Sequence, residues 1–124
     1  MSDPRLLAAA AAIAVALMVA VWAHRGERRR AVRARLDLAG IDARVVFFSD
    51  VTCARCDIVR SHLEALDAEF TEIAYDREHE VHRRVGVTGV PLVVIRDATG
   101  AEVRRFAGAM TKARLALALG RERR

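Results

Sequence analysis

The stretch Cys53-Ala54-Arg55-Cys56 contains both cysteines of this 124-residue chain and separates the apolar run VVFF at 45–48 from a helical pattern that begins at Cys53. A Cys-x-x-Cys motif at a strand-to-helix turn is typical of redox-active pairs. Unpaired N–H groups and the helix dipole favour a thiolate at a helix start, so Cys53 is the candidate nucleophile. Cys56, one turn further on, is the candidate resolving thiol, because it can attack a mixed disulfide on Cys53.

The length and the cysteine count limit what the chain can build. Part of the sequence is a hydrophobic leader, so the remainder has room for one small domain with one core. Two cysteines are too few for the disulfide scaffold of a small secreted protein. The pair therefore serves reactivity or metal binding.

The net charge of +5 is concentrated in a short segment. Residues 25–35 contain six arginines and one glutamate, whereas residues 44–120 contain eleven basic and eleven acidic side chains. The presumed folded part is therefore neutral and lacks a basic face for a phosphate backbone, and we expect no nucleic-acid partner. A second, smaller basic segment is the tail at 121–124.

Residues 6–23 form an uncharged run of 18 residues, half of it alanine, that ends beside Trp22. This run is long enough to cross a bilayer as a helix, with Trp22 at the interface. We predict an uncleaved transmembrane anchor at 1–24, a basic juxtamembrane linker at 25–43 and a folded domain at 44–120. A cleaved secretory signal is the alternative, with Val21 and Ala23 before the cut. The residues at 29–38 are expected to form a solvated spacer, because few of them are apolar; the alternative is that they pack on the domain as a helix.

The charges beside this run predict an orientation. Six arginines follow it and only Arg5 precedes it, so the positive-inside rule predicts that residues 24 onward lie in the cytoplasm. The extracytoplasmic side is the alternative. The arginines are expected to lie on a solvated linker helix that fixes this orientation; attraction of anionic lipid headgroups is the alternative.

From residue 44 the pattern alternates between strands and helices in the order β-α-β-α-β-β-α, which predicts an α/β domain. The expected strands cover 44–49, 71–75, 91–95 and 102–106, and the expected helices cover 53–69, 76–85 and 111–119. A turn is expected at 97–100, where Asp97 and Gly100 favour chain reversal.

Three landmarks in this order resemble the thioredoxin family: the Cys-x-x-Cys motif, the segment GVTGVP at 86–91, and the segment FAGAMTK at 106–112. The resemblance covers residues 44–120 and implies a minimal thioredoxin-like fold with a central mixed four-stranded sheet, preceded here by the predicted anchor. It also implies that Pro91 follows a cis peptide bond beside the thiols. The backbone of Val90 would then pair with an extended substrate peptide.

The chain departs from the thioredoxin pattern at several positions near the cysteines. Thr52 replaces the tryptophan before the first cysteine, and Phe47 replaces a buried aspartate that assists proton transfer. No general base is therefore carried over from the family. Either water or Asp50 would have to accept the proton of Cys56, and Asp50 can do so only if its side chain does not point away. The dipeptide Ala54-Arg55 is expected to tune the redox couple, because a guanidinium beside Cys53 favours its thiolate.

These observations predict a membrane-tethered thiol-disulfide oxidoreductase that needs no cofactor and acts as a monomer. Its partners would be protein thiol or disulfide clients and an upstream electron donor or acceptor; the redox direction stays open. One alternative is a redox-inactive interaction module with the same fold. Another is a zinc site formed by Cys53, Cys56, His79 and His82, although the two histidines lie in a polar run that predicts a solvated helix face.

Overall fold

The structure is a computed structural model that describes residues 3–122 of the chain. Its helices are α1 (Pro4–Arg33), α2 (Ala54–Ala65), α3 (Tyr75–Val85) and α4 (Lys112–Glu122). Its strands are β1 (Val45–Ser49), β2 (Thr71–Ala74), β3 (Leu92–Arg96) and β4 (Glu102–Ala107). After α1, the elements follow the predicted order β-α-β-α-β-β-α. The last residues of the tail at 121–124 lie outside the described range.

The four strands form one mixed sheet in the order β2-β1-β3-β4. Strand β1 is parallel to β2 and antiparallel to β3, and β3 is antiparallel to β4. Parallel neighbours need a crossover connection, and α2 supplies it between β1 and β2. The predicted α/β fold with a central mixed four-stranded sheet is confirmed.

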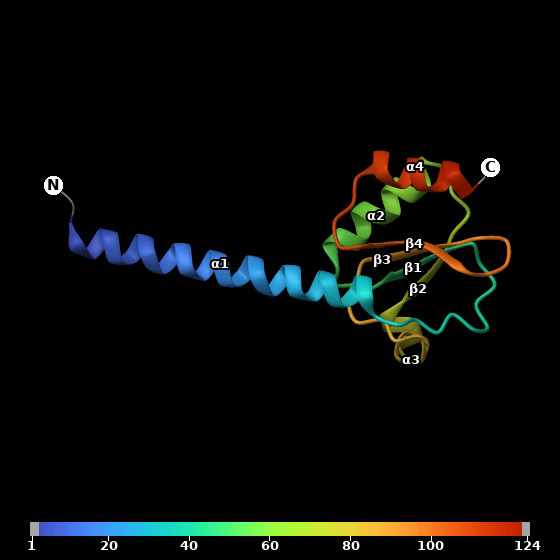
Figure 1. Cartoon of the computed structure of the whole chain (residues 1–124), viewed down its shortest axis with the longest axis horizontal. Coiled ribbons are helices and arrows are strands. Elements are labelled where there is room, and N and C mark those ends of the chain that lie inside the picture. The colour runs from blue at the N-terminus through green and yellow to red at the C-terminus, as the bar shows by residue number, and fades with distance from the viewer. Residues whose placement is uncertain (1–2, 123–124) are drawn as a thin grey trace.

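Strand β1 is the centre of the core, because all five of its residues are buried. Successive side chains of a strand point to opposite faces. Val45 and Phe47 accordingly pack with α2 and α4, and Val46 and Phe48 pack on the face covered by α3 (Figure 1). Neither phenylalanine exposes any surface, and removing such a side chain costs about 3–5 kcal/mol of stability.

Helix α2 ends four residues before the predicted position. The N–H groups of Asp67 and Ala68 donate to the carbonyls of Glu64 and Leu63, at 3.0 and 3.1 Å, and Asp67 has a φ of 52°. This is the helix-ending pattern in which a left-handed residue satisfies the last carbonyls. Glycine is the usual residue there, and its absence explains why the sequence predicted a longer helix.

The turn between β3 and β4 forms at the predicted residues 97–100. The carboxylate of Asp97 accepts hydrogen bonds from the Thr99 hydroxyl at 2.5 Å and from the N–H groups of Thr99 and Ala101 at 2.9 and 3.1 Å. The Thr99 hydroxyl and these N–H groups lower the pKa of Asp97. The side chain thus closes the turn locally, which is why the sequence alone located it.

The expectation of a solvated spacer at 29–38 is wrong. Helix α1 continues without a break to residue 33, and Ala31 is only 4% exposed. Leu36, Leu38 and Ile41 then pack against the same core cluster as Phe48. The apolar residues are too irregularly spaced to show a helix face in the sequence, and this packing depends on the sheet beneath them. The proposed boundaries at 24 and 43 stay a prediction.

A single arginine of β4 holds the end of α1. The guanidinium of Arg105 donates to the carbonyl oxygens of Ala31, Val32 and Ala34, at 3.0, 3.1 and 2.5 Å. The carboxylate of Glu102 fixes this guanidinium through two contacts of 2.6 and 2.7 Å. Carbonyls at a helix end lack partners within the helix, and the guanidinium of Arg105 supplies those hydrogen bonds. Its positive charge also interacts favourably with the negative end of the helix dipole.

The rest of α1 projects away from the domain (Figure 1). Its most apolar 18-residue window has a mean hydropathy of 2.5, and none of that window is buried. Leu6 is 69% exposed and Trp22 is 72% exposed. By length and composition this helix could cross a membrane; signal sequences share these features.

Candidate redox site

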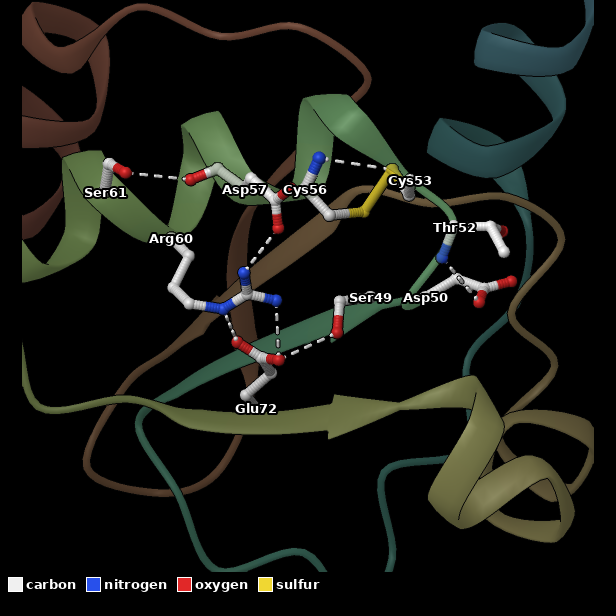
Figure 2. Close-up of polar contacts among 9 residues, drawn as sticks. All are labelled: Ser49, Asp50, Thr52, Cys53, Cys56, Asp57, Arg60, Ser61 and Glu72. Atoms are coloured by element: carbon white, nitrogen blue, oxygen red, sulfur yellow. Dashed lines mark hydrogen bonds and ion pairs between the residues drawn. A yellow bond between two sulfur atoms is a disulfide. The ribbon is translucent and has the colours of Figure 1, made fainter.

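The two cysteines lie after the carboxyl end of β1, where the chain turns into α2. Cys53 is the N-cap residue of α2, and its Sγ accepts a hydrogen bond from the N–H of Cys56 at 3.1 Å. The two sulfurs form a disulfide, and the Cα atoms are 5.2 Å apart (Figure 2). An N-cap acceptor faces the unpaired N–H groups of the first turn, so the same geometry would stabilise a Cys53 thiolate once the disulfide is reduced.

The two cysteines differ in accessibility. Cys53 is partly exposed, whereas Cys56 is fully buried. Attack on an external disulfide requires an accessible sulfur, because the attacking thiolate must reach the client sulfur with which it forms the new bond. The geometry therefore suits Cys53 to meet a client and Cys56 to close the internal disulfide.

The loop before the cysteines is held by Asp50. Its carboxylate accepts from the N–H of Thr52 at 3.3 Å, and its carbonyl oxygen accepts from the N–H of Cys53 at 3.1 Å. Figure 2 shows the Asp50 side chain turned toward Thr52 and away from the two sulfurs. In this orientation Asp50 orders the loop and does not point at Cys56, which favours water over Asp50 as the proton acceptor.

The dipeptide between the cysteines is exposed, and Arg55 reaches toward α1. Its Nη1 atom lies 3.1 Å from Nε2 of His24. Ala54 opens α2 and has an exposed side chain. The structure thus places the guanidinium at the junction of α2 with α1, a contact that the sequence did not predict.

Pro91 follows a cis peptide bond from Val90, as the resemblance implies. Pro91 is buried, and its carbonyl oxygen accepts from the N–H of Gly108 at 3.0 Å. Val90 is partly buried and packs against the same core cluster as Cys53. The fold therefore brings Val90, one of the two predicted peptide-binding residues, to the core cluster that contains Cys56 and against which Cys53 packs.

An ion-pair network lies beneath α2, and sequence reasoning missed it. Arg60 of α2 contacts both carboxylate oxygens of Glu72 on β2, at 2.6 and 2.9 Å, and the carboxylate of Asp57 at 2.7 Å (Figure 2). Glu72 also accepts from the hydroxyl of Ser49 at 3.0 Å. The i,i+3 pairing of Asp57 with Arg60 is visible in the sequence, but the strand partner becomes clear only once β1 and β2 are aligned.

This network adjoins the position where the thioredoxin pattern has its buried aspartate. Phe47 fills that position and is the register partner of Glu72. The guanidinium carbon of Arg60 lies 5.9 Å from the centroid of the Phe47 ring. Hydrogen bonds from Arg60, together with one from Ser49, lower the pKa of Glu72. The contacts with Glu72 and Asp57 raise the pKa of Arg60. A carboxylate with a lowered pKa is a weak base, so Glu72 does not replace the missing aspartate.

The alternative zinc set is not assembled among residues 3–122, where no group of three or more potential ligands lies together. His82 is buried, contrary to the expected solvated face. Its Nε2 donates to the carbonyl oxygen of Ile73 at 2.7 Å, and its ring packs edge-on against Phe48 and Tyr75. Cys56 belongs to the core cluster on the other face of the sheet. His82 is thus a core residue with its hydrogen bond satisfied.

Comparisons with known proteins agree with this geometry, although no family model matches the sequence. The chain is 32% identical over 65 residues to the SPbeta prophage-derived thioredoxin-like protein YosR of Bacillus subtilis strain 168, covering 52% of this chain and 81% of that protein. It resembles the thioredoxin NaTrxh from Nicotiana alata, with 26% identity, a TM-score of 0.54, and coverage of 63% and 70% of the two chains. A mutant thioredoxin from Halobacterium salinarum NRC-1 has 24% identity, a TM-score of 0.55, and coverage of 63% and 72%.

The fold, the disulfide at the start of α2 and the similarity to YosR together support a function in thiol-disulfide redox chemistry. The chain belongs to the thioredoxin-like family.

The lowered pKa of Glu72 predicts a pH-dependent contribution to stability. A carboxyl group whose pKa is lower in the folded state stabilises the fold above its unfolded value, and this stability is lost as the pH falls through the folded value. We expect Glu72→Gln to reduce the free energy of unfolding at pH 7 by about 1 kcal/mol. The difference from wild type should shrink below the ordinary glutamate pKa of 4.5.

Denaturant unfolding in detergent at several pH values between 3 and 7, roughly the range over which glutamate titrates, measures this difference. Glu64→Gln, at an exposed position of α2, is the matched control and should follow wild type throughout. A constant gap between the Glu72→Gln and wild-type curves would show that the ion pair does not supply the pH dependence.

Proposed function

We propose that this protein is a membrane-tethered oxidoreductase that exchanges two electrons with protein thiols or disulfides. Cys53 is the nucleophile and Cys56 the resolving thiol. The disulfide at the N-terminus of α2, with one accessible and one buried cysteine, is the observation that carries this proposal. The exposed apolar part of α1 supports the tether.

In the reducing direction, the Cys53 thiolate attacks a client disulfide and forms a mixed disulfide, and one client sulfur leaves as a thiolate. The Cys56 thiolate then attacks Cys53, forms the internal disulfide and releases the second client thiolate. The client gains two electrons and the protein loses two, so an upstream donor must reduce the pair for another cycle. Reversing the same steps would oxidise a client dithiol.

The client peptide is proposed to lie along Val90 and Pro91, next to the partly exposed Cys53. No residue is assigned as general base for Cys56. Phe47 occupies the aspartate position, and the pKa of Glu72 is lowered by Arg60. Solvent water is the proposed proton acceptor.

Reduction of insulin disulfides with dithiothreitol as donor tests the proposal on the full chain in detergent. We expect Cys53→Ser to abolish turnover, because no nucleophile remains. In a separate reaction, Cys56→Ser that has been reduced and then freed of dithiothreitol should accumulate a mixed disulfide with insulin, visible on a non-reducing gel, because no second thiol remains to resolve it. If wild type and Cys53→Ser are equally inactive, the redox-inactive interaction module is the better explanation.

Arg55 is proposed to tune the couple by favouring the Cys53 thiolate. Arg55→Ala should slow alkylation of reduced Cys53 by iodoacetamide near neutral pH and make the pair a weaker oxidant. Family potentials span about −270 to −120 mV, so a shift is measurable. Arg83→Ala, at an exposed position of α3, is the matched control. Unchanged alkylation in Arg55→Ala would mean that the contact with His24 holds the guanidinium away from the sulfur.

We propose that the domain faces the cytoplasm, because six arginines follow the apolar run and only Arg5 precedes it. A membrane-impermeant maleimide added to intact cells should then leave the cysteines unlabelled until the cells are opened. Rapid labelling of Cys53 in intact cells would place the domain on the extracytoplasmic side.

A further inference from the structure

The apolar part of α1 and the domain are joined without a flexible segment. Helix α1 runs from residue 4 to residue 33 with helical geometry throughout, and the apolar run ends inside it at Ala23. From Ala23 to the buried Ala31 the helix rises about 12 Å. The domain is therefore carried on the helix itself, close to the end of its apolar part.

Several contacts fix the domain on this helix. Arg105 donates to three carbonyls at the end of α1, and Glu102 holds its guanidinium. Just after the helix, the N–H of Asp37 donates to the carbonyl of Val85 at 2.9 Å. A Cβ added to Gly86 would lie only 3.1 Å from the Arg35 carbonyl oxygen, so this segment lies tightly against the end of α3.

The redox site lies level with the end of the apolar run. His24 is the first residue after that run, and it contacts Arg55, which stands between the two cysteines. Figure 2 shows α1 passing at the same end of the sheet as the disulfide. If the apolar run spans a bilayer, Cys53 lies at the depth of the lipid headgroups.

The same stretch of α1 also approaches the two loops that flank the proposed peptide site. A Cβ added to Gly89, next to Val90, would lie 4.0 Å from the Cβ of Ala31. A Cβ added to Gly108 would lie 3.8 Å from Cδ of Arg28. Helix α1 therefore lines one side of the site and blocks approach to Cys53 from that side. In the proposed function this helix is the membrane anchor.

The exposed residues around the site suit this position. Val51 and Ile58 flank the cysteines and are 73% and 56% exposed. Exposed arginines follow the apolar run on α1 and would bind anionic headgroups; they are Arg25, Arg28, Arg29, Arg30 and Arg33. Exposed apolar side chains next to a reactive sulfur, together with these arginines, are the side chains expected of a protein surface that lies at a membrane interface.

We infer that the clients of this protein are integral membrane proteins whose reactive cysteines lie within the first few residues outside their own membrane span. This inference rests on the proposed function and names its substrate class. The rigid attachment holds Cys53 at headgroup depth, so a cysteine near the bilayer meets it often. A cysteine on a distant domain meets it rarely.

Capture of a client disulfide by the Cys56→Ser full chain in lipid nanodiscs tests the inference. The Cys53 thiolate attacks the client disulfide, one mixed disulfide forms, and the second client sulfur leaves as a thiolate, so no other reagent is needed. The probe is a synthetic single-span peptide with a disulfide-closed loop at both ends, so that either orientation is productive. In one form the loops lie about 3 residues from the span, and in the other they lie about 25 residues from it. A flexible chain of about 25 residues has an average end-to-end distance of about 25–30 Å.

We expect mixed disulfide with the near-loop peptide to form at least about tenfold faster than with the far-loop peptide, because the first pair shares a confined layer. A control chain carries about 12 Gly and Ser residues between Ala23 and His24, which leaves residues 24–124 unchanged and adds about 20 Å of flexible reach. In this control the preference for the near loop should fall to about threefold or less. The flexible linker lets the domain sample a larger volume, which lowers the effective concentration of Cys53 near the bilayer.

Soluble insulin distinguishes failure of this inference from failure of the proposed function, because capture of insulin does not depend on the distance of a client cysteine from the bilayer. Equal rates for the near and far loops, an undiminished preference in the linker control, or failure of the chain to remain with the nanodiscs would each overturn the inference while insulin is still captured. If neither peptide nor insulin is captured, the proposed function itself fails.

Discussion

Strand β1 is buried on both faces, and this constraint determines where the chemistry can occur. Because all five residues lie inside the core, the chain must leave the sheet at Ser49 and cover it with a helix before β2 can pair in parallel. The start of that helix lies just beyond the carboxyl end of β1. Cys53 is its N-cap, so the packing of the core delivers the sulfur to the N–H groups of the first turn.

The site keeps the cysteines of the thioredoxin pattern and changes what lies beneath them. A phenylalanine ring and an arginine occupy the region that would otherwise hold a buried acid. The positive charge of Arg60 is paired with Glu72 and Asp57, so the network joins α2 to β2 and holds both carboxylates in ion pairs. In the proposed function, proton transfer to and from Cys56 differs from the family pattern, while the thiol exchange itself is the same.

Features encoded by neighbouring residues could be predicted from the sequence. The order of elements, the turn at Asp97 and the placement of both cysteines at a helix start all follow from local patterns, and the structure agrees with them. Features that depend on long-range contacts could not be predicted in this way. Arg105 meets carbonyls more than seventy residues earlier, Arg60 meets a glutamate on a neighbouring strand, and His82 turns into the core.

The hydrogen bonds from Arg105 to the end of α1 couple the orientation of the helix to that of the domain. A hydrophobic helix in a bilayer adjusts its tilt to the thickness of the surrounding lipid. If α1 spans a bilayer as proposed, a change in its tilt would rotate the whole domain by the same angle, because hydrogen bonds and packing join the helix to the sheet. Lipid composition would thereby act on the angle at which the sulfur pair faces its neighbours in the plane of the membrane.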